Sequence, residues 1–320
     1  MKNIFSKLKT GPVLVTGCSG DIGHSIGKIL KMENCCEMTI GTDIKNEHAA
    51  FSLFDKCVVV PKASDDNYLT EFSKIISKYR PSLIIPTSEQ ELKFFHKFKL
   101  SQIESTPLIM ANEHSMQIGF DKYLTYQFLK ENHLPFPWTT LTSNKNPDSL
   151  PCICKGREGA GSKNVAIIYN QQDIDYFSKK GDDLIWQELL LPDDEEYTCG
   201  IFRSKHGEIR TIAFKRKLEG GHTKSGVLRN TPAITDVLTK IATGLELRGC
   251  INVQLRNTSK GAVVFEINPR FSSTVLFRHL LNFQDLLWSM ADTLNLPIPH
   301  YEKRENGIKF YRINDELICP

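Results

Sequence analysis

Short apolar runs alternate with amphipathic segments over the first 110 residues of the chain. The apolar runs VLVTG, MTIGTD, CVVVP, SLIIPT and PLIMA predict strands. Between them, HSIGKILKM, DNYLTEFSKIISKYR and EQELKFFHKFK place apolar side chains at helical spacing, as Leu69, Phe72 and Ile76 do in the second segment. Strands that alternate with helices indicate a parallel sheet with helices on its faces.

The pattern changes after residue 112. DKYLTYQFLKENH predicts a helix with Asp121 as its N-cap, and from Pro151 onward strand patterns follow in close succession, which favours antiparallel sheets. The helical segment ITDVLTKIATGLEL precedes the strands CINVQLRN and GAVVFEINP, and the helical FQDLLWSMADTL follows them. The expected fold class is α/β followed by α+β, in three units over residues 1–112, 113–190 and 191–320.

Charge and composition narrow the class of protein. The formal net charge is only +3, with basic and acidic residues interspersed, which argues against a nucleic-acid partner. A basic run such as KRK, Lys215 to Lys217, is read as a solvated face. No window of 18 apolar residues and no signal peptide are found, so neither a membrane nor export is expected. The nine cysteines fit no zinc spacing and indicate reduced thiols in a cytoplasmic protein.

The first glycine-rich loop, GCSGDIG, follows a predicted strand and precedes a helix, with Asp43 twenty residues after its last glycine. This arrangement is typical of nucleotide-binding domains, but the spacing GxxGxxG differs from GxGxxG and also occurs in NAD-dependent epimerases. Such enzymes need a YxxxK pair, and Tyr126/Lys130 and Tyr176/Lys180 both fit. The first pair lies where an epimerase would still be adding parallel strands, so we interpret both as accidental.

A second glycine-rich loop, CKGREGAGSKNVAII, lies between two predicted strands and is not a P-loop. Glycines allow backbone N–H groups to approach phosphate oxygens closely, and Lys155 at the end of the incoming strand can reach the same charge. The alternative is an ordinary hairpin turn.

The strand VVFEINPR carries a more specific signal. Alternation along a strand places Glu266, Asn268 and Arg270 on one face, and Phe265 and Ile267 on the other, in a core. Carboxylate and amide oxygens suit Mg²⁺, and an arginine beside them suits a phosphate or carboxylate. The alternative is a strand with a polar outer face.

Two further segments contribute oxygen and backbone groups. In INVQL, Asn252 and Gln254 share one face of a strand. In WQELLLPDDEEYT, the strand with Glu188 runs into an acidic turn, where backbone groups near Leu190 can bind an adenine edge and Glu196 can accept from ribose hydroxyls. A charged turn without ligand is the alternative for this last segment.

Taken together, these segments resemble the ATP-grasp superfamily, and most closely its carbamoyl-phosphate-synthase-like branch. DKYLTYQFLKENHLPFP, KGREGAGSKNV, WQELLLPDDEEYT, NVQL and VFEINPRFSS occur in the family's order from Asp121 to about Ser273. The preceding unit resembles the family's Rossmann-like pre-ATP-grasp domain, and the two later units its lid and large subdomains. The glycine loop of that first domain then faces the acceptor substrate, near Ser19–Ile22, PTSEQE, Ser272 and Arg278.

The resemblance implies roles at matched positions. The nucleotide contacts implied are Lys122 and Lys155 on the phosphates, Gly159, Gly161 and Ser162 in a mobile loop over them, Glu188 and Leu190 on adenine, Glu196 on ribose, and His222 on the nucleotide. Gln254, Glu266 and Asn268 are the implied Mg²⁺ ligands, and the implied catalytic residues are Arg270, on the acyl phosphate, and Lys155.

Three positions depart from the family pattern. Gly156 stands where a proline commonly follows the lysine, and Asn164 replaces a common glycine. Gln254 stands where many relatives carry glutamate, and a neutral amide binds a metal more weakly, which puts occupancy by two metal ions in doubt.

The resulting hypothesis is an ATP-dependent carboxylate–amine or carboxylate–thiol ligase that forms an acyl phosphate and releases ADP and phosphate, with an amine as the expected nucleophile. It would use ATP with Mg²⁺, or Mn²⁺ in its place, and act on small-molecule carboxylate and amine substrates. We expect it to bind neither nucleic acid nor membrane, and the sequence leaves a homodimer open. Two alternatives stand beside it. One is an NAD-dependent epimerase- or dehydratase-like protein, and the other is a non-catalytic ATP-binding regulator, against which the retained Lys155, Glu266, Asn268 and Arg270 argue.

Overall fold

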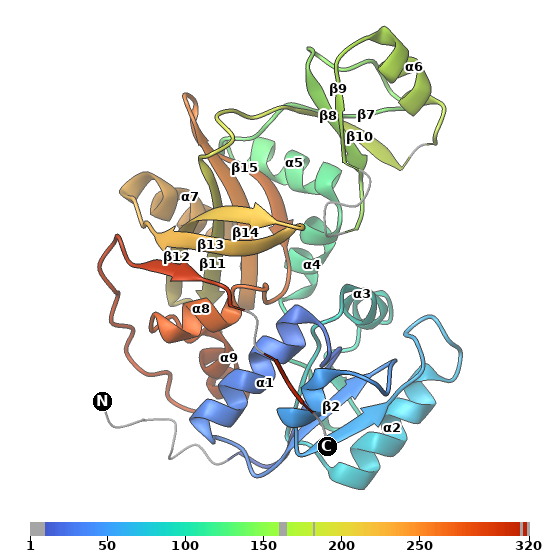
Figure 1. Ribbon diagram of the computed structural model, residues 1–320, viewed down its shortest axis with the longest axis vertical. Coiled ribbons are helices and arrows are strands. Elements are labelled where there is room, and N and C mark those ends of the chain that lie inside the picture. Colours follow the sequence, from blue (N-terminus) through green and yellow to red (C-terminus); the bar gives the residue numbers. More distant parts are fainter. Residues whose placement is uncertain (1–9, 160–164, 182, 314–315, 319–320) are drawn as a thin grey trace.

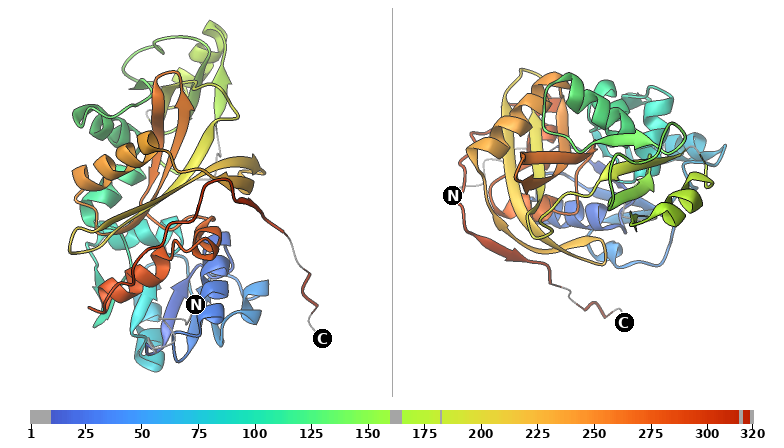
Figure 2. Two further views of the ribbon diagram at one scale, coloured as in Figure 1. Left: turned by 90° about the vertical axis from the view of Figure 1, so that its left-hand side faces the viewer. Right: turned by 90° about the horizontal axis from the view of Figure 1, so that it is seen from above.

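The computed structural model describes residues 10–159, 165–181, 183–313 and 316–318. Three sheets dominate it: a parallel N-terminal sheet, a small antiparallel sheet at the far end of the long axis, and a larger antiparallel sheet beside the other two (Figure 1). Seen from the side, the small sheet again lies at the end of the long axis opposite the N-terminal unit (Figure 2). The expected combination of a parallel α/β unit with antiparallel sheets is confirmed.

The N-terminal unit is a parallel sheet in the order β3-β2-β1-β4. Its elements are β1 (Val13–Thr16), α1 (Asp21–Glu33), β2 (Thr39–Asp43), the 3₁₀ turn η2 (Ala49–Ser52), β3 (Lys56–Val59), α2 (Tyr68–Tyr79), β4 (Leu83–Ile85) and α3 (Glu89–Lys97). The run PLIMA does not form the expected strand. It gives only the two-residue β6 (Thr106–Pro107), paired with β5 (Gln102–Ile103), and a parallel bridge from Leu108 to Ile84.

Two consecutive helices, α4 (Glu113–Phe120) and α5 (Lys122–Glu131), connect this unit to the rest. Asp121 caps α5 as expected, because its carboxylate accepts hydrogen bonds from the backbone N–H groups of Tyr123 and Leu124 at 2.8 and 3.2 Å. Helix α4 was not expected from the sequence. A Cβ at Gly119 would lie 2.7 Å from the ring of Pro269, so glycine permits the close approach of α4 to the turn that follows the EINPR strand.

The lid sheet, as we call the small antiparallel sheet, has the order β7-β10-β8-β9. It comprises β7 (Thr139–Leu141), β8 (Cys152–Gly156), β9 (Ala166–Ile168), α6 (Gln171–Ser178) and β10 (Leu184–Glu188). Helix α6 was not predicted; it is only eight residues long, and Ile174 is its one buried residue. Its N-cap Asn170 accepts from the N–H of Asp173 at 3.0 Å.

The large sheet has the order β15-β14-β11-β12-β13-β16 and is antiparallel throughout. Its elements are β11 (Glu196–Arg203), β12 (Ile209–Glu219), β13 (His222–Leu228), α7 (Pro232–Gly244), β14 (Gly249–Thr258), β15 (Gly261–Asn268), α8 (Val275–Leu280), α9 (Asp285–Thr293) and β16 (Lys309–Tyr311). The domain boundaries after residues 112 and 190 stay a prediction.

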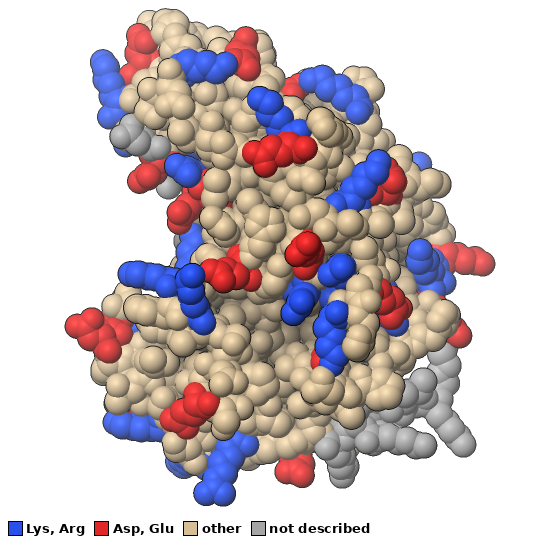
Figure 3. Space-filling view, turned by 180° about the vertical axis from the view of Figure 1, so that it is seen from behind, with Lys and Arg blue, Asp and Glu red and all other residues tan. Residues whose placement is uncertain are grey.

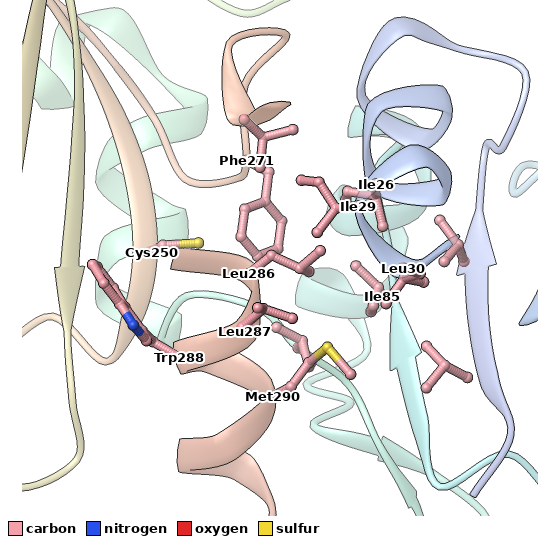
Figure 4. Packing of buried hydrophobic residues seen from close by; sticks show 14 of the residues in the cluster. Ile26, Ile29, Leu30, Ile85, Cys250, Phe271, Leu286, Leu287, Trp288 and Met290 are labelled. Atoms are coloured by element: carbon pink, nitrogen blue, oxygen red, sulfur yellow. The ribbon is translucent and has the colours of Figure 1, made fainter. Parts of the chain in front are cut away.

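Helices cover both faces of the large sheet. On one face α5 and α7 pack with Val253, Leu255 and Ile267 in a common core. On the other face α9 projects Leu286, Leu287 and Met290 toward α1 of the N-terminal unit (Figure 4). This second core joins the N-terminal unit to the large sheet and holds the carboxyl end of β1 close to the large sheet.

The surface and the cysteines agree with the expectations from composition. Basic and acidic side chains are interspersed over the face shown in Figure 3. All eight cysteines within the described residues are free. None of the helices in the described part of the chain is long and apolar enough to cross a membrane.

Candidate active site

The register of the large sheet gathers the predicted metal ligands. Gln254 on β14 lies opposite Glu266 on β15, and Asn252 lies opposite Asn268 one step along the same face. Asn252 and Gln254 therefore share a face as expected, and the candidate ligands Gln254, Glu266 and Asn268 form one polar group on it. Asn252 itself is buried and accepts from the hydroxyl of Thr198 at 2.9 Å.

A β-bulge alters one prediction on β15. Gln254 pairs with Glu266 and Leu255 with Val264, so Phe265 has no partner on β14. The expectation that Phe265 points into a core with Ile267 is wrong. Ile267 is buried in the core, but Phe265 is half-buried and its ring lies 5.7 Å below the amine of Lys155, which places it in the site.

Arg270 also departs from the predicted alternation. Strand β15 ends at Asn268, and the N–H of Arg270 donates back to the carbonyl of Asn268 in a turn. Its guanidinium nevertheless lies beside the candidate metal ligands, because Nη2 is 3.3 Å from Oδ1 of Asn268. Its Nη1 donates to the carbonyl of Phe271 at 3.1 Å. Burial lowers the pKa of Arg270, while Glu89 and Glu266 favour its charge.

Lys155 is buried on β8 of the lid sheet, and its amine faces the large sheet. Burial lowers its pKa to about 8, with Lys122 acting in the same direction and Glu266 and Glu196 opposing it. Within the described residues no carboxylate forms an ion pair with Lys155, so its buried amine is available to an anionic ligand such as a phosphate.

Lys122 connects the lid to the metal ligands. Its amine donates to the carbonyl of Gly159 at 2.7 Å and lies 4.0 Å from Oε1 of Glu266. Gly159 has φ +96°, a conformation that favours glycine. Lys122 and Gly159 thus lie together as expected, whereas Gly161, Ser162 and Asn164 lie outside the described residues.

Glu196, the predicted ribose contact, is held by two arginines. Oε1 accepts from Nε and Nη2 of Arg216 at 3.0 and 2.6 Å, and Oε2 accepts from Nη2 of Arg256 at 2.7 Å. Nη2 of Arg216 also donates to Oε1 of Gln254 at 2.9 Å. The interpretation of KRK as a solvated face is wrong for Arg216, whose side chain is 9% exposed. Alternation along β12 places Arg216 on the opposite face of the strand from Lys215 and Lys217, and this pattern could have predicted its different environment.

The predicted adenine residues lie at the end of the lid sheet. The carboxylate of Glu188 pairs with Lys260 at 2.6 Å and accepts from the N–H of Trp138 at 3.3 Å. Leu190 is buried, and its carbonyl accepts from Arg256. The side chain of Glu188 is thus engaged with its neighbours, and an adenine contact in this segment would rest on the backbone.

His222 lies away from the groups above. It begins β13, and its Nδ1 is 2.9 Å from Oδ2 of Asp21 on the first turn of α1. The structure therefore joins His222 to the glycine loop of the N-terminal unit, and its contact with a nucleotide stays a prediction.

The first glycine loop is filled by the protein's own carboxylate. Asp43 is buried at the end of β2, and its two oxygens accept from the N–H groups of Ser19 and Lys45 at 3.0 and 3.2 Å. Burial would raise the pKa of Asp43, but these hydrogen bonds outweigh burial and lower the pKa. The N–H that a dinucleotide phosphate would use is thus occupied.

The two YxxxK pairs also do not support an NAD-dependent epimerase. Lys130 and Lys180 lie over the rings of Tyr126 and Tyr176 at 5.9 and 4.3 Å, in α5 and just after α6. The second pair belongs to the lid unit, far along the molecule from the first glycine loop (Figure 1).

Two residues expected near the acceptor are buried. Arg278 is 1% exposed and pairs with Asp285 at 3.2 Å, so it belongs to the core and not to a substrate surface. Ser272 is also buried, with its hydroxyl 2.7 Å from that of Thr274.

The donor set fits a magnesium ion at Glu266 with Asn268 beside it. Within the described residues no group of three His, Cys, Asp or Glu side chains could hold a metal. The site therefore offers one carboxylate and amide oxygens, which are acceptable ligands for Mg²⁺ when phosphate oxygens complete the shell.

Comparison with known proteins resolves the family. Residues 181–314 match the family described as "ATP-grasp in the biosynthetic pathway with Ter operon", and residues 13–108 match the "PylC-like, N-terminal domain". By this match the chain is an ATP-grasp protein over residues 181–314. The resemblance inferred from the sequence motifs is confirmed, and the match favours it over the NAD-dependent epimerase- or dehydratase-like alternative.

Curated and solved relatives place the fold of this ATP-grasp protein more closely. A D-alanine–D-alanine ligase of Petrotoga mobilis is 33% identical over 92 residues, which are 28% of this chain and 29% of that ligase. N5-carboxyaminoimidazole ribonucleotide synthetase of Thermus thermophilus has a TM-score of 0.72 at 15% identity, covering 92% of this chain and 81% of that one. The biotin carboxylase domain of 2-oxoglutarate carboxylase from Hydrogenobacter thermophilus, solved with MgADP and bicarbonate, has a TM-score of 0.74 at 12% identity, covering 91% and 71%.

Proposed function

We propose that this ATP-grasp protein is an ATP-dependent carboxylate–amine ligase. The observation that carries the proposal is the convergence of Lys122, Lys155 and Arg270 on Glu266 and Asn268, from three separate parts of the chain. Two of these cations, Lys122 and Arg270, also donate to backbone carbonyls. Three cations around one carboxylate suit a triphosphate with its metal.

The proposed reaction has two steps. The carboxylate of a small-molecule substrate attacks the γ-phosphorus of ATP, which forms an acyl phosphate and releases ADP. An amine then attacks the acyl carbon, forms the amide and releases phosphate, with its proton passing to solvent or to that phosphate. Mg²⁺ held by Glu266 and Asn268 would supply charge neutralisation on the phosphates when bound.

The chain's own residues perform positioning and charge stabilisation. Lys155 and Lys122 orient the β- and γ-phosphates. Arg270 follows the metal ligand Asn268 by two residues, and we place the meeting of the substrate carboxylate and the γ-phosphate beside it. Glu196 and the backbone around Leu190 hold the nucleoside. The contact between Lys93 of α3 and Glu158 beside the lid loop, 3.0 Å long, ties the lid to the N-terminal unit and so helps to exclude water from the acyl phosphate.

The acceptor substrate would enter between the first glycine loop and Arg270. We infer this location because a shared hydrophobic core holds the N-terminal unit, which carries the glycine loop, against the large sheet. The cytoplasmic location expected from the sequence belongs to this proposal as well, and the sequence leaves a homodimer open. A regulator that only binds ATP is disfavoured, because Lys155 is kept and buried and Arg270 is kept and half-buried beside Asn268.

The test is a screen of carboxylic acids with Mg²⁺, ATP and hydroxylamine as a general nucleophile. Hydroxylamine converts an acyl phosphate to a hydroxamate, so the missing amine does not limit the assay. We expect at least one acid to produce ADP and hydroxamate in equal amounts, and Arg270→Lys to lower both together. ADP release that no acid increases, from a protein that binds ATP, would favour the regulator instead.

A further inference from the structure

The ring of Phe265 lies beside a lysine on which the proposed nucleotide site depends. Lys155 is 8% exposed, and its amine is 5.7 Å from the centroid of the Phe265 ring. We propose that Phe265 is a positioning residue, which holds the charged amine of Lys155 over its face in the free protein and keeps this contact when a nucleotide phosphate binds the amine from its open side. This inference rests on the proposed function and names a residue that places its phosphate-binding lysine.

A β-bulge turns Phe265 toward this lysine. Ala262, Val264 and Ile267 all lie in one hydrophobic core, so the spacing of core residues along β15 changes from two residues to three. The strand register shifts at the same place and leaves Phe265 without a partner on β14. Phe265 and Glu266 therefore share the face opposite that core, since a bulge re-aims a side chain of its strand. Strict alternation would have placed the ring in the core.

The ring takes the place that a carboxylate partner would have. In the described part of the chain no carboxylate forms an ion pair with Lys155, and the two carboxylates that favour its charge are held by other cations. Glu266 lies 4.0 Å from the amine of Lys122, and Glu196 accepts hydrogen bonds from two arginines. An aromatic face attracts an ammonium group but carries no net charge. The ring therefore does not repel an incoming phosphate, as a carboxylate would.

The contact has a pH dependence of definite sign. Burial lowers the pKa of Lys155 to about 8, with Lys122 acting in the same direction. Glu266 and Glu196 oppose this shift, and the ring adds an attraction that acts only on the protonated amine, so removing the ring lowers the pKa of Lys155 further. Below about pH 6.5 the amine is charged in the free protein and in the complex, and losing the ring affects both alike. Above about pH 8 the free amine is neutral, only the complex loses the attraction, and the affinity for nucleotide falls.

The experiment compares nucleotide affinity at two pH values. Adenylyl imidodiphosphate with Mg²⁺ is titrated into the wild type and into Phe265→Leu, which keeps an apolar side chain without the ring. We expect the variant to bind more weakly than the wild type by about twofold or less at about pH 6.5, and by about 5- to 30-fold at about pH 9. Phe98→Leu is the matched control, because Lys97 lies over that ring at 5.6 Å but at an exposed position. Its affinity should equal that of the wild type at both pH values.

Further variants separate the lysine contact from other roles of the ring. In a Lys155→Met background the ring has no cation to hold, so adding Phe265→Leu should not weaken binding further at about pH 9. Phe265→Tyr keeps an aromatic face and should recover most of the affinity that Phe265→Leu loses. If Phe265→Leu does not fold, a fluorinated phenylalanine at this position keeps the shape, weakens the negative potential of the face, and should reproduce the loss.

The results distinguish the role of Phe265 from the proposed function. A loss of the same size at both pH values, or a loss in the Lys155→Met background equal to that in the wild type, would overturn the role of Phe265 and leave the proposed ligase intact. An adenosine affinity that falls in step with analogue affinity would overturn it as well, because adenosine has no phosphate for Lys155 to bind. Failure of the wild type to bind the analogue at both pH values would instead overturn the proposed function.

Discussion

The carboxylate of Asp43 accepts a hydrogen bond from the backbone N–H of Ser19 at 3.0 Å, inside the first glycine loop. In a dinucleotide-binding domain that N–H would face a phosphate, and the acidic residue after the second strand would face a ribose. Here the two groups bind each other, and a Cβ at Gly23 would lie 2.3 Å from the carbonyl of Gly17, so the loop is closed tightly on itself. In this protein the glycine pattern GCSGDIG, which resembles that of NAD-binding domains, thus allows the backbone to form a tight loop.

The metal prediction concerns Glu266. Glu266→Gln removes the only carboxylate among the candidate ligands, so we expect Mg²⁺ affinity in the presence of nucleotide to fall by at least tenfold and turnover to fall with it. Isothermal titration of Mg²⁺ into the nucleotide-saturated protein measures this. Glu302→Gln, at an exposed position, is the matched control. Equal metal affinity in both variants would place the ion elsewhere.

The fold could be predicted from the sequence where the determining contacts are local. Strand alternation correctly places Asn252 with Gln254 and Glu266 with Asn268, and the N-cap at Asp121 follows from the residues just after it. The helix α6 was missed because it is eight residues long and buries one residue, Ile174, so its pattern is short and weak.

The rest of the site depends on partners distant in the chain. The bulge at Phe265 exists only in the pairing of β15 with β14, and the burial of Arg216 depends on Glu196 and Gln254 from two neighbouring strands. The alternation pattern of one strand alone can predict neither the bulge nor the burial of Arg216. The guess that Arg278 faces a substrate failed for the same reason, since its partner Asp285 and the core around it come from another helix.

The prediction for Arg270 separates catalysis from binding. The guanidinium contacts Asn268 and the carbonyl of Phe271 and forms no ion pair with Glu266 within 4.0 Å in the described residues, so it is not needed to neutralise that carboxylate. Arg270→Lys keeps the charge but loses the fork. We expect turnover to fall on the order of 10²-fold, as for removal of one preorganised donor, with ATP affinity changed much less.

Nucleotide affinity, unfolding free energy and turnover should be measured on the same Arg270 variant. A loss of stability large enough to explain the whole loss of activity, or affinity that falls in step with rate, would show that Arg270 supports the turn after β15 and not the transferred phosphoryl group.

The pH prediction follows from Lys155. Burial lowers its pKa to about 8, so the free protein loses this positive charge as the pH rises through about 8. A bound triphosphate favours the protonated form and raises the pKa, so nucleotide binds with uptake of a proton at high pH. Affinity for a nucleotide analogue should therefore fall by roughly tenfold or more between about pH 7.5 and 9.5. Lys155→Met should bind weakly, with little of this dependence. A wild-type affinity that is constant over this range would contradict the assignment of Lys155 to the phosphates.

We propose that the polar group on the large sheet binds ATP with its metal and that the first glycine loop binds no dinucleotide. Thermal unfolding of the wild type with Mg²⁺–ATP and, separately, with NADH or NADPH compares the two sites in one measurement. We expect a rise in the unfolding temperature with Mg²⁺–ATP that is absent in Glu266→Gln, and no rise with either dinucleotide. Stabilisation by NADH or NADPH, with none by Mg²⁺–ATP, would contradict it.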